Sequence, residues 1–183
     1  MAPYHHLLAH FPIALLSLAF LIILLRSFSA GELARRFDAV LPHLMALGLL
    51  AGVVTLATGL IIWPAEAMTT SPMGRNKILI SIWMMACWSV VLLLRWRGGE
   101  ALWQGSGRAL MLGLGTLGMI LLATTGTLGG HLLGTPSRLT GLFRAIGWDV
   151  YQTYYVPDWV LLVRVIVGLA GLAAGLLRPG KPA

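Results

Sequence analysis

The 183-residue chain contains 58% hydrophobic and only 10% charged residues, a balance that excludes an ordinary soluble domain and indicates a protein dissolved in lipid. The formal net charge of +7 does not indicate nucleic-acid binding, because the basic residues lie between apolar runs and not in one patch. The single cysteine, Cys87, excludes an intramolecular disulfide, and without a C-x-x-C-H motif covalent c-type haem is excluded as well.

The predicted fold is all-α: an integral membrane bundle of five transmembrane helices in a single domain over residues 1–183. Each apolar run approaches the ~20 residues that a bilayer core requires. No Lys or Arg precedes the first run, and the run is too long for a signal-peptide core, so we expect it to be retained. The expected spans are Leu7–Leu25, Leu41–Trp63, Ile78–Leu94, Ala109–Leu133 and Trp159–Leu177.

The basic residues also predict an orientation. The positive-inside rule assigns the more basic set of connections to the cytoplasm. We therefore expect a multi-pass protein of the bacterial inner membrane, with its N-terminus outside and its C-terminus in the cytoplasm. One set of connections carries Arg26, Arg35, Arg36, Arg95, Arg97, Arg108, Arg178 and Lys181, and the other carries only Arg75, Lys77, Arg138 and Arg144.

The one long connection, residues 135–157, is expected on the outer side. Thr135 is a plausible helix cap and Pro136 a plausible first helical residue. A short helix lying along the outer membrane surface is predicted from the helical spacing of Leu139, Leu142, Phe143 and Ile146. The following aromatic residues suit a membrane interface, and they serve either as a simple anchor or as a docking surface for a partner.

The histidines point to a cofactor. In this topology His10 and His131 lie on different helices at the same outer depth, as an axially ligated b-type haem requires. His6 lies one turn from His10 on the same helical face and is the fallback ligand. Gly126 and Gly130 leave space beside His131 either for a flat macrocycle or for another helix. The sequence thus predicts one haem b with His10 and His131 as iron ligands.

A charged residue inside the fifth span supports this hypothesis. Arg164 is costly there, by about 2.5–3.5 kcal/mol at a helix centre and less nearer the surface. A haem propionate would be a suitable partner, because guanidinium binds carboxylate in bidentate fashion. The alternatives are that Arg164 extends to the outer headgroups or pairs with Asp158.

Two other interpretations of the histidines stay open. Copper or zinc bound by His6, His10 and a third ligand is one, and no metal at all is the other. A second haem is not expected, because His43 is the only histidine in the cytoplasmic half.

Three segments resemble a known family. The opening HHLLAHFPIALL is similar to the start of a widespread family of small bacterial membrane proteins of unknown function, whose first span typically reads H-P-x-x-V-H-F-P-I-A-L. The similarity continues in GLLAGVVTLATGLIIW and in TTGTLGGHLL and covers about the first 135 residues. The family-like positions are His6, His10, Gly129 and Gly130. The chain departs from the family where Leu7 replaces a proline, and where Arg75, Asn76 and Lys77 stand in place of a histidine often found at the start of the third span.

The leading functional interpretation is a non-catalytic electron-transfer subunit with one haem near the outer face. It would pass electrons between a quinone, or a neighbouring subunit, and a periplasmic redox protein. The family resemblance is consistent with a redox setting, since members are found fused or adjacent to redox modules. The alternative is an accessory subunit without a cofactor in a larger respiratory or photosynthetic complex. A small transporter is less consistent with the sequence, because none of the predicted spans contains an acidic residue.

Overall fold

Four long helices form the body of the protein, in a computed structural model that describes residues 2–151 and residues 159, 162–163, 165–166, 168–170 and 173. All four are long and apolar enough to cross a membrane, which confirms four of the predicted spans. The predicted fifth span, Trp159–Leu177, lies largely outside the described residues. The four are α1 (Ala2–Phe28), α2 (Glu32–Ile62), α4 (Pro72–Gly98) and α5 (Gly105–Leu132).

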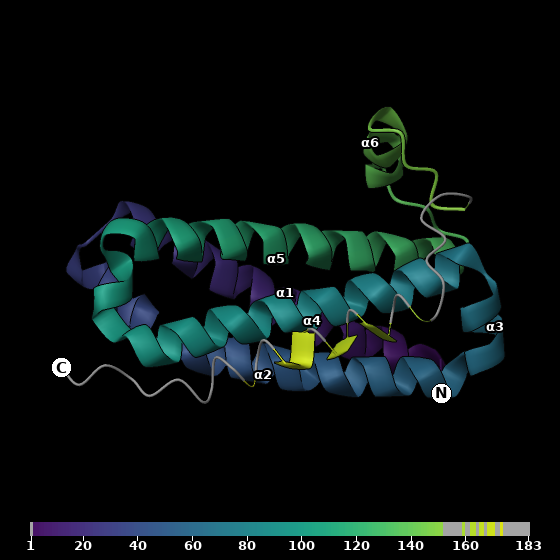
Figure 1. The fold of residues 1–183 in the computed structure, drawn as a ribbon, viewed down its shortest axis with the longest axis horizontal. Coiled ribbons are helices and arrows are strands. Elements are labelled where there is room, and N and C mark those ends of the chain that lie inside the picture. Colours follow the sequence, from purple (N-terminus) through teal and green to yellow (C-terminus); the bar gives the residue numbers. More distant parts are fainter. Residues whose placement is uncertain are drawn as a thin grey trace.

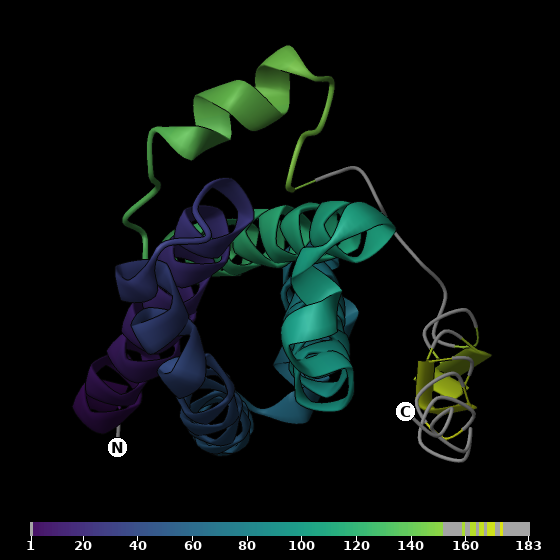
Figure 2. The ribbon, with the colours of Figure 1, turned by 90° about the vertical axis from the view of Figure 1, so that its left-hand side faces the viewer.

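These helices form a ring in which each is antiparallel to its neighbours (Figures 1 and 2). α1 packs against α2 and α5, and α4 packs against the same two helices, so that α1 and α4 lie diagonally opposite each other. At 1.5 Å per residue a helix of this length spans about 40 Å, enough to cross a bilayer. We call the end where α1 begins and α5 finishes the histidine end, and the end with Arg26 and Arg95 the arginine end.

Short connections hold the ring together. α3 (Ala65–Thr70) joins α2 to α4 at the histidine end, and the 3₁₀ helix η1 (Gly99–Trp103) joins α4 to α5 at the arginine end. Ser71 caps α4 because its hydroxyl accepts from the Gly74 N–H at 3.0 Å. Gly99 ends the helix with a φ of +49°, a conformation that costs glycine little.

Glycines set how closely the helices approach. A Cβ atom on Gly48 of α2 would lie only 2.8 Å from Leu16 Cδ2 of α1, and one on Gly118 of α5 would lie 2.9 Å from Trp88 of α4. These glycines therefore pack helix against helix, the common use of small residues in membranes. Gly126 differs, because a Cβ there would meet nothing within 4 Å.

The long connection after α5 contains a short helix, as predicted, but that helix begins later than expected. α6 (Leu139–Ala145) has Arg138 at its N-cap position, so the prediction that Thr135 caps it is wrong. Both the backbone N–H and the hydroxyl of Thr135 donate to the Gly130 carbonyl, so Thr135 closes the C-terminal end of α5 instead. α6 stands off from the bundle beyond α5 (Figure 1). Its place relative to the membrane surface stays a prediction.

Candidate functional site

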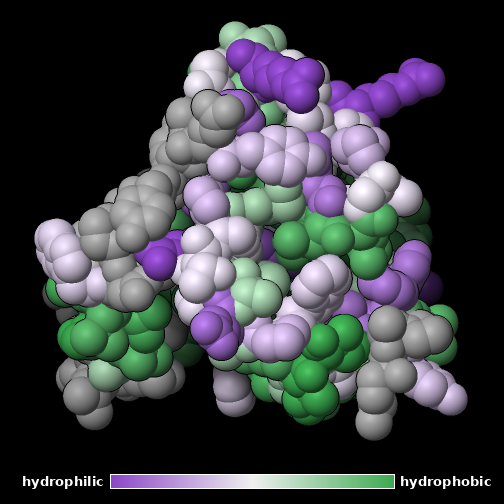
Figure 3. Space-filling model, turned by 90° about the vertical axis from the view of Figure 1, so that its right-hand side faces the viewer, coloured by the Kyte–Doolittle hydropathy of each residue, from purple (hydrophilic) through white to green (hydrophobic). Residues whose placement is uncertain are grey.

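A cavity of about 240 Å³ opens between the helices at the histidine end. We call it the histidine pocket. Most of its wall is apolar, and Figure 3 shows hydrophilic residues interspersed among hydrophobic ones at this end of the molecule. Among the described residues that line it there is no carboxylate. Its ionisable side chains are His5, His6 and His10 from α1 and Lys77 from α4.

His5 contacts α2 through a hydroxyl. Its Nδ1 lies 3.1 Å from the hydroxyl of Thr58 on α2. That hydroxyl also lies 3.0 Å from the carbonyl oxygens of Val54 and Thr55, and when it donates to one of them it accepts from His5 Nδ1. In that arrangement the Nε2 atom of a neutral His5 carries a lone pair.

His10 is held in the same tautomer. Its Nδ1 lies 2.7 Å from the His6 carbonyl oxygen, and a carbonyl only accepts, so Nδ1 carries the proton. Within the described residues His10 Nε2 has no hydrogen-bond partner. A histidine that donates one ring N–H to a backbone carbonyl and leaves the other nitrogen available is arranged as metal-ligating histidines are.

Lys77 brings a cationic side chain into the same pocket from α4. Its Nζ donates to the Thr125 carbonyl of α5 at 2.6 Å and lies close to Gly129, where a Cβ would be 3.3 Å from it. An ammonium group among apolar helices is expensive unless it has partners. In the sequence Lys77 is identified as a connection charge and as one of three residues in place of a family histidine, but not as a site residue. The signal that could have identified it is its position directly before the apolar run that begins at Ile78.

Glycines line the pocket from α2 and α5, two helices that lie diagonally opposite each other. Gly52 and Gly59 line it from α2, and Gly126, Gly129 and Gly130 line it from α5. The space beside most of them is filled, since a Cβ on Gly52 would lie 2.6 Å from Met85 Sδ, one on Gly59 3.0 Å from His5 Cε1 and one on Gly129 3.3 Å from Lys77 Nζ. Of these five glycines Gly126 alone would have nothing within 4 Å of a Cβ, so the open space for a ring lies beside it.

The structure does not bring His131 into this pocket. His131 is buried, with Nδ1 2.7 Å from the Tyr151 hydroxyl and Nε2 2.6 Å from the Thr140 hydroxyl. It thus ties the end of α5 to α6 and the segment after it. Of the predicted site residues, His6, His10, Gly126 and Gly130 line one cavity, His131 faces away from it, and Arg164 lies outside the described residues.

The structure gives no independent indication of a metal ion. In the described part of the chain, no group of three or more His, Cys, Asp or Glu side chains is arranged to hold one. His43 is exposed on α2 and does not line the histidine pocket.

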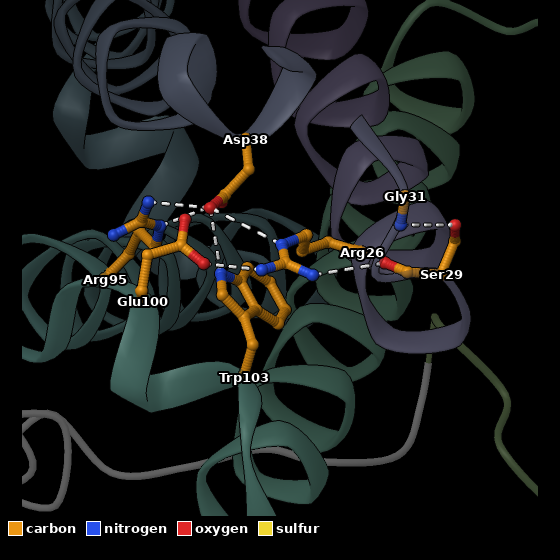
Figure 4. Close-up of polar contacts among 7 residues, drawn as sticks. All are labelled: Arg26, Ser29, Gly31, Asp38, Arg95, Glu100 and Trp103. Carbon is orange, nitrogen blue, oxygen red and sulfur yellow. Dashed lines mark hydrogen bonds and ion pairs between the residues drawn. The ribbon is translucent and has the colours of Figure 1, made fainter. Parts of the chain in front are cut away.

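A second polar cluster lies at the arginine end (Figure 4). Asp38 of α2 is fully buried and accepts from Arg95 of α4 and from the Trp103 indole N–H, while Arg26 of α1 pairs with Glu100. The cluster joins three of the long helices and η1. Its charged groups are paired with one another, so we interpret it as structural.

Comparison with known proteins gives one match. The model of a family described as predicted membrane protein (DUF2231) matches residues 1–135. That range contains the four long helices and every residue that lines the histidine pocket. No curated protein and no solved structure matches the chain.

Proposed function

The chain belongs to the predicted membrane protein family DUF2231, and we propose that it serves in the membrane as an electron-transfer subunit that holds a redox-active ring in the histidine pocket. The observation that carries this proposal is the combination, in one pocket of an apolar four-helix bundle, of imidazoles, a lysine amine and open space beside Gly126. Electrons would pass between a quinone, or a neighbouring subunit, and a redox partner outside the membrane. The protein would supply binding, orientation and exclusion of water.

One form of this proposal is the b haem predicted from the sequence. His10 suits it, because its Nε2 is available and its Nδ1 is fixed by the His6 carbonyl. Gly126 leaves open space in the wall. His131 does not line the pocket and its Nε2 lies 2.6 Å from the Thr140 hydroxyl, so it would have to give up that bond to serve as second ligand. When bound, the haem would supply a one-electron couple tuned by its ligands and burial.

The test of the haem form is a reduced-minus-oxidised absorbance spectrum of the purified protein, expressed with haem available. A b-type α band is expected, and His10→Ala and His131→Ala should each abolish it. His43→Ala is the matched control and should keep the band, since His43 does not line the pocket. A normal low-spin spectrum in both the His10 and His131 variants would overturn the ligand assignment.

A second candidate function is favoured by the surroundings of His131. Both of its ring nitrogens are bonded to hydroxyls, which gives this histidine a structural role without any metal. An accessory subunit without a cofactor would use such a cluster to hold α6 and its neighbouring residues in place for docking to a larger complex. In that case the spectrum would show no α band, and partner subunits would co-purify with the intact protein.

A further inference from the structure

We infer that the histidine pocket is the head-group site for a quinone of the membrane pool, held by Lys77 of α4 and by the imidazoles of α1. This inference rests on the proposed electron-transfer function and names the ligand class. The volume of the cavity supports a small ring as the ligand. A cavity of about 240 Å³ lies just below the 300–1,000 Å³ typical of ligand pockets. A single substituted ring fits that volume better than a four-ring macrocycle.

The hydrogen-bonding groups match both redox forms of such a ring. The ammonium group of Lys77 has three N–H donors. One donates to the Thr125 carbonyl, and the other two are available for a quinone carbonyl oxygen. The Nε2 atoms of His5 and His10 are acceptors in the neutral tautomers, so either could accept from the hydroxyl of a quinol. The pocket therefore offers a donor on one wall and acceptors on the diagonally opposite helix.

The charge of the pocket favours a head group that accepts hydrogen bonds and carries no cation. Among the described residues no carboxylate lines the pocket, and the Thr125 carbonyl is the only polar partner of Lys77. A head group that presents a cation to Lys77 would be repelled by it. A quinone oxygen offsets part of the cost of holding the lysine among apolar helices.

Other parts of the pocket suit the ring faces and the isoprenoid tail of a quinone. Gly126 of α5 leaves room for the face of a planar ring, because nothing lies within 4 Å of a Cβ position there. Apolar lining residues continue beyond it and would contact an isoprenoid tail: Ile13, Leu56, Leu60, Leu122 and Leu132.

The experiment measures binding of a benzoquinone with a decyl tail to the full chain in quinone-free phosphatidylcholine nanodiscs. Quinones quench tryptophan fluorescence and Trp63 lines the pocket, so quenching reports binding, and Trp63→Phe should remove most of the signal. Lys77→Met should weaken binding by about tenfold or more, because one hydrogen bond from a charged donor is lost. Lys77→Arg should retain part of the affinity. Arg108→Met makes the same change of charge at the exposed start of α5 and should have no effect.

A second pair of variants tests the pocket without altering charge. Gly126→Leu should block binding by filling the cavity, whereas Gly113→Leu should not. Both glycines lie on α5 with open space at the Cβ position, and only Gly126 lines the pocket. Size-exclusion profiles of all variants identify any that misfold, and Gly126→Leu keeps the inference testable if Lys77→Met is one of them.

The outcomes separate this inference from the proposed function. Quinone binding that depends on Lys77 and Gly126, in protein that shows no haem spectrum, supports both the quinone site and the proposed function. Equal affinity in wild type, Lys77→Met and Gly126→Leu overturns the quinone site, as does displacement of the probe by a stoichiometric fatty acid. If the protein shows a b-type spectrum that requires His10 but binds no quinone, the quinone site is overturned. The proposed electron-transfer function is then still supported. If the protein shows no b-type spectrum and binds no quinone, both the quinone site and the proposed function are overturned.

Discussion

Asp38 and Arg95, 57 residues apart in the sequence, form a bidentate ion pair at the arginine end, with Nε and Nη2 of Arg95 lying 2.8 and 2.7 Å from the two carboxylate oxygens of Asp38. Asp38 is fully buried, and the Trp103 indole donates to it as well, at 3.0 Å. Arg26 Nε lies 3.8 Å away on the other side. One carboxylate thus holds cationic groups from α1 and α4, the two helices that do not neighbour each other in the ring.

Removing that carboxylate should strongly destabilise the bundle. Asp38→Asn keeps the shape of the side chain but leaves two largely buried guanidinium groups without their shared anion, and we expect a loss of about 3–5 kcal/mol. The measurement is unfolding by denaturing detergent, followed by circular dichroism. Glu32→Gln is the control, because the Glu32–Arg36 pair is exposed and its loss should cost at most about 1 kcal/mol. Equal free energies of unfolding for the two variants would show that the Asp38 cluster does not stabilise the bundle.

The bonds of His131 should hold α6 in place. Thr140→Val removes the hydroxyl that bonds to Nε2 of His131 in a buried contact. The loss should cost about 1–3 kcal/mol of local stability. Tyr151→Phe should cost less, since Tyr151 is exposed. Hydrogen exchange of the amides in residues 139–145 reports the effect, with faster exchange expected in both variants. Tyr4→Phe, at an exposed tyrosine in the first turn of α1, should change nothing there.

Phe143 and Leu142 are neighbours in α6 with different expected roles. Phe143 is 8% exposed and packs on Trp148 with ring centroids 4.8 Å apart, whereas Leu142 is 57% exposed. Phe143→Ala should therefore cost about 3 kcal/mol of local stability and Leu142→Ala at most about 0.5 kcal/mol.

Co-purification of partner subunits shows whether α6 docks a partner or only anchors the chain at the membrane. If the outer connection docks a partner, Leu142→Ser alone should reduce co-purification of other subunits while leaving exchange protection unchanged. Unchanged co-purification would limit the segment to anchoring.

The predicted orientation has a direct test. In a Cys87→Ser background, Ser137→Cys should react with a membrane-impermeant thiol reagent added from the periplasmic side. Ser106→Cys, at the other end of α5, should react only after the membrane is opened. The reverse pattern would place the histidine end in the cytoplasm, but the residues of the pocket would still share one side.

Arg164, which lies outside the described residues, enters one prediction of the haem form. Arg164→Leu should keep the haem and lower its midpoint potential, because removing a nearby positive charge disfavours the added electron. Potentiometric titration of the α band measures it. An unchanged potential would remove the proposed contact with a propionate.

The length and composition of the apolar runs determined the lipid environment and four spans, because crossing a bilayer is a local property of about 20 consecutive residues. The same runs could not determine which way each helix faces. A helix that is apolar on all sides carries no stripe to mark its inner face. The rotation that turns His10 toward a cavity and His131 toward Tyr151 is set by packing against other helices. Likewise Lys77 and Asp38 appear in the sequence as charges near the ends of apolar runs. Only the tertiary structure places one in a pocket with three imidazoles and the other against Arg95, because each contact joins residues dozens of positions apart.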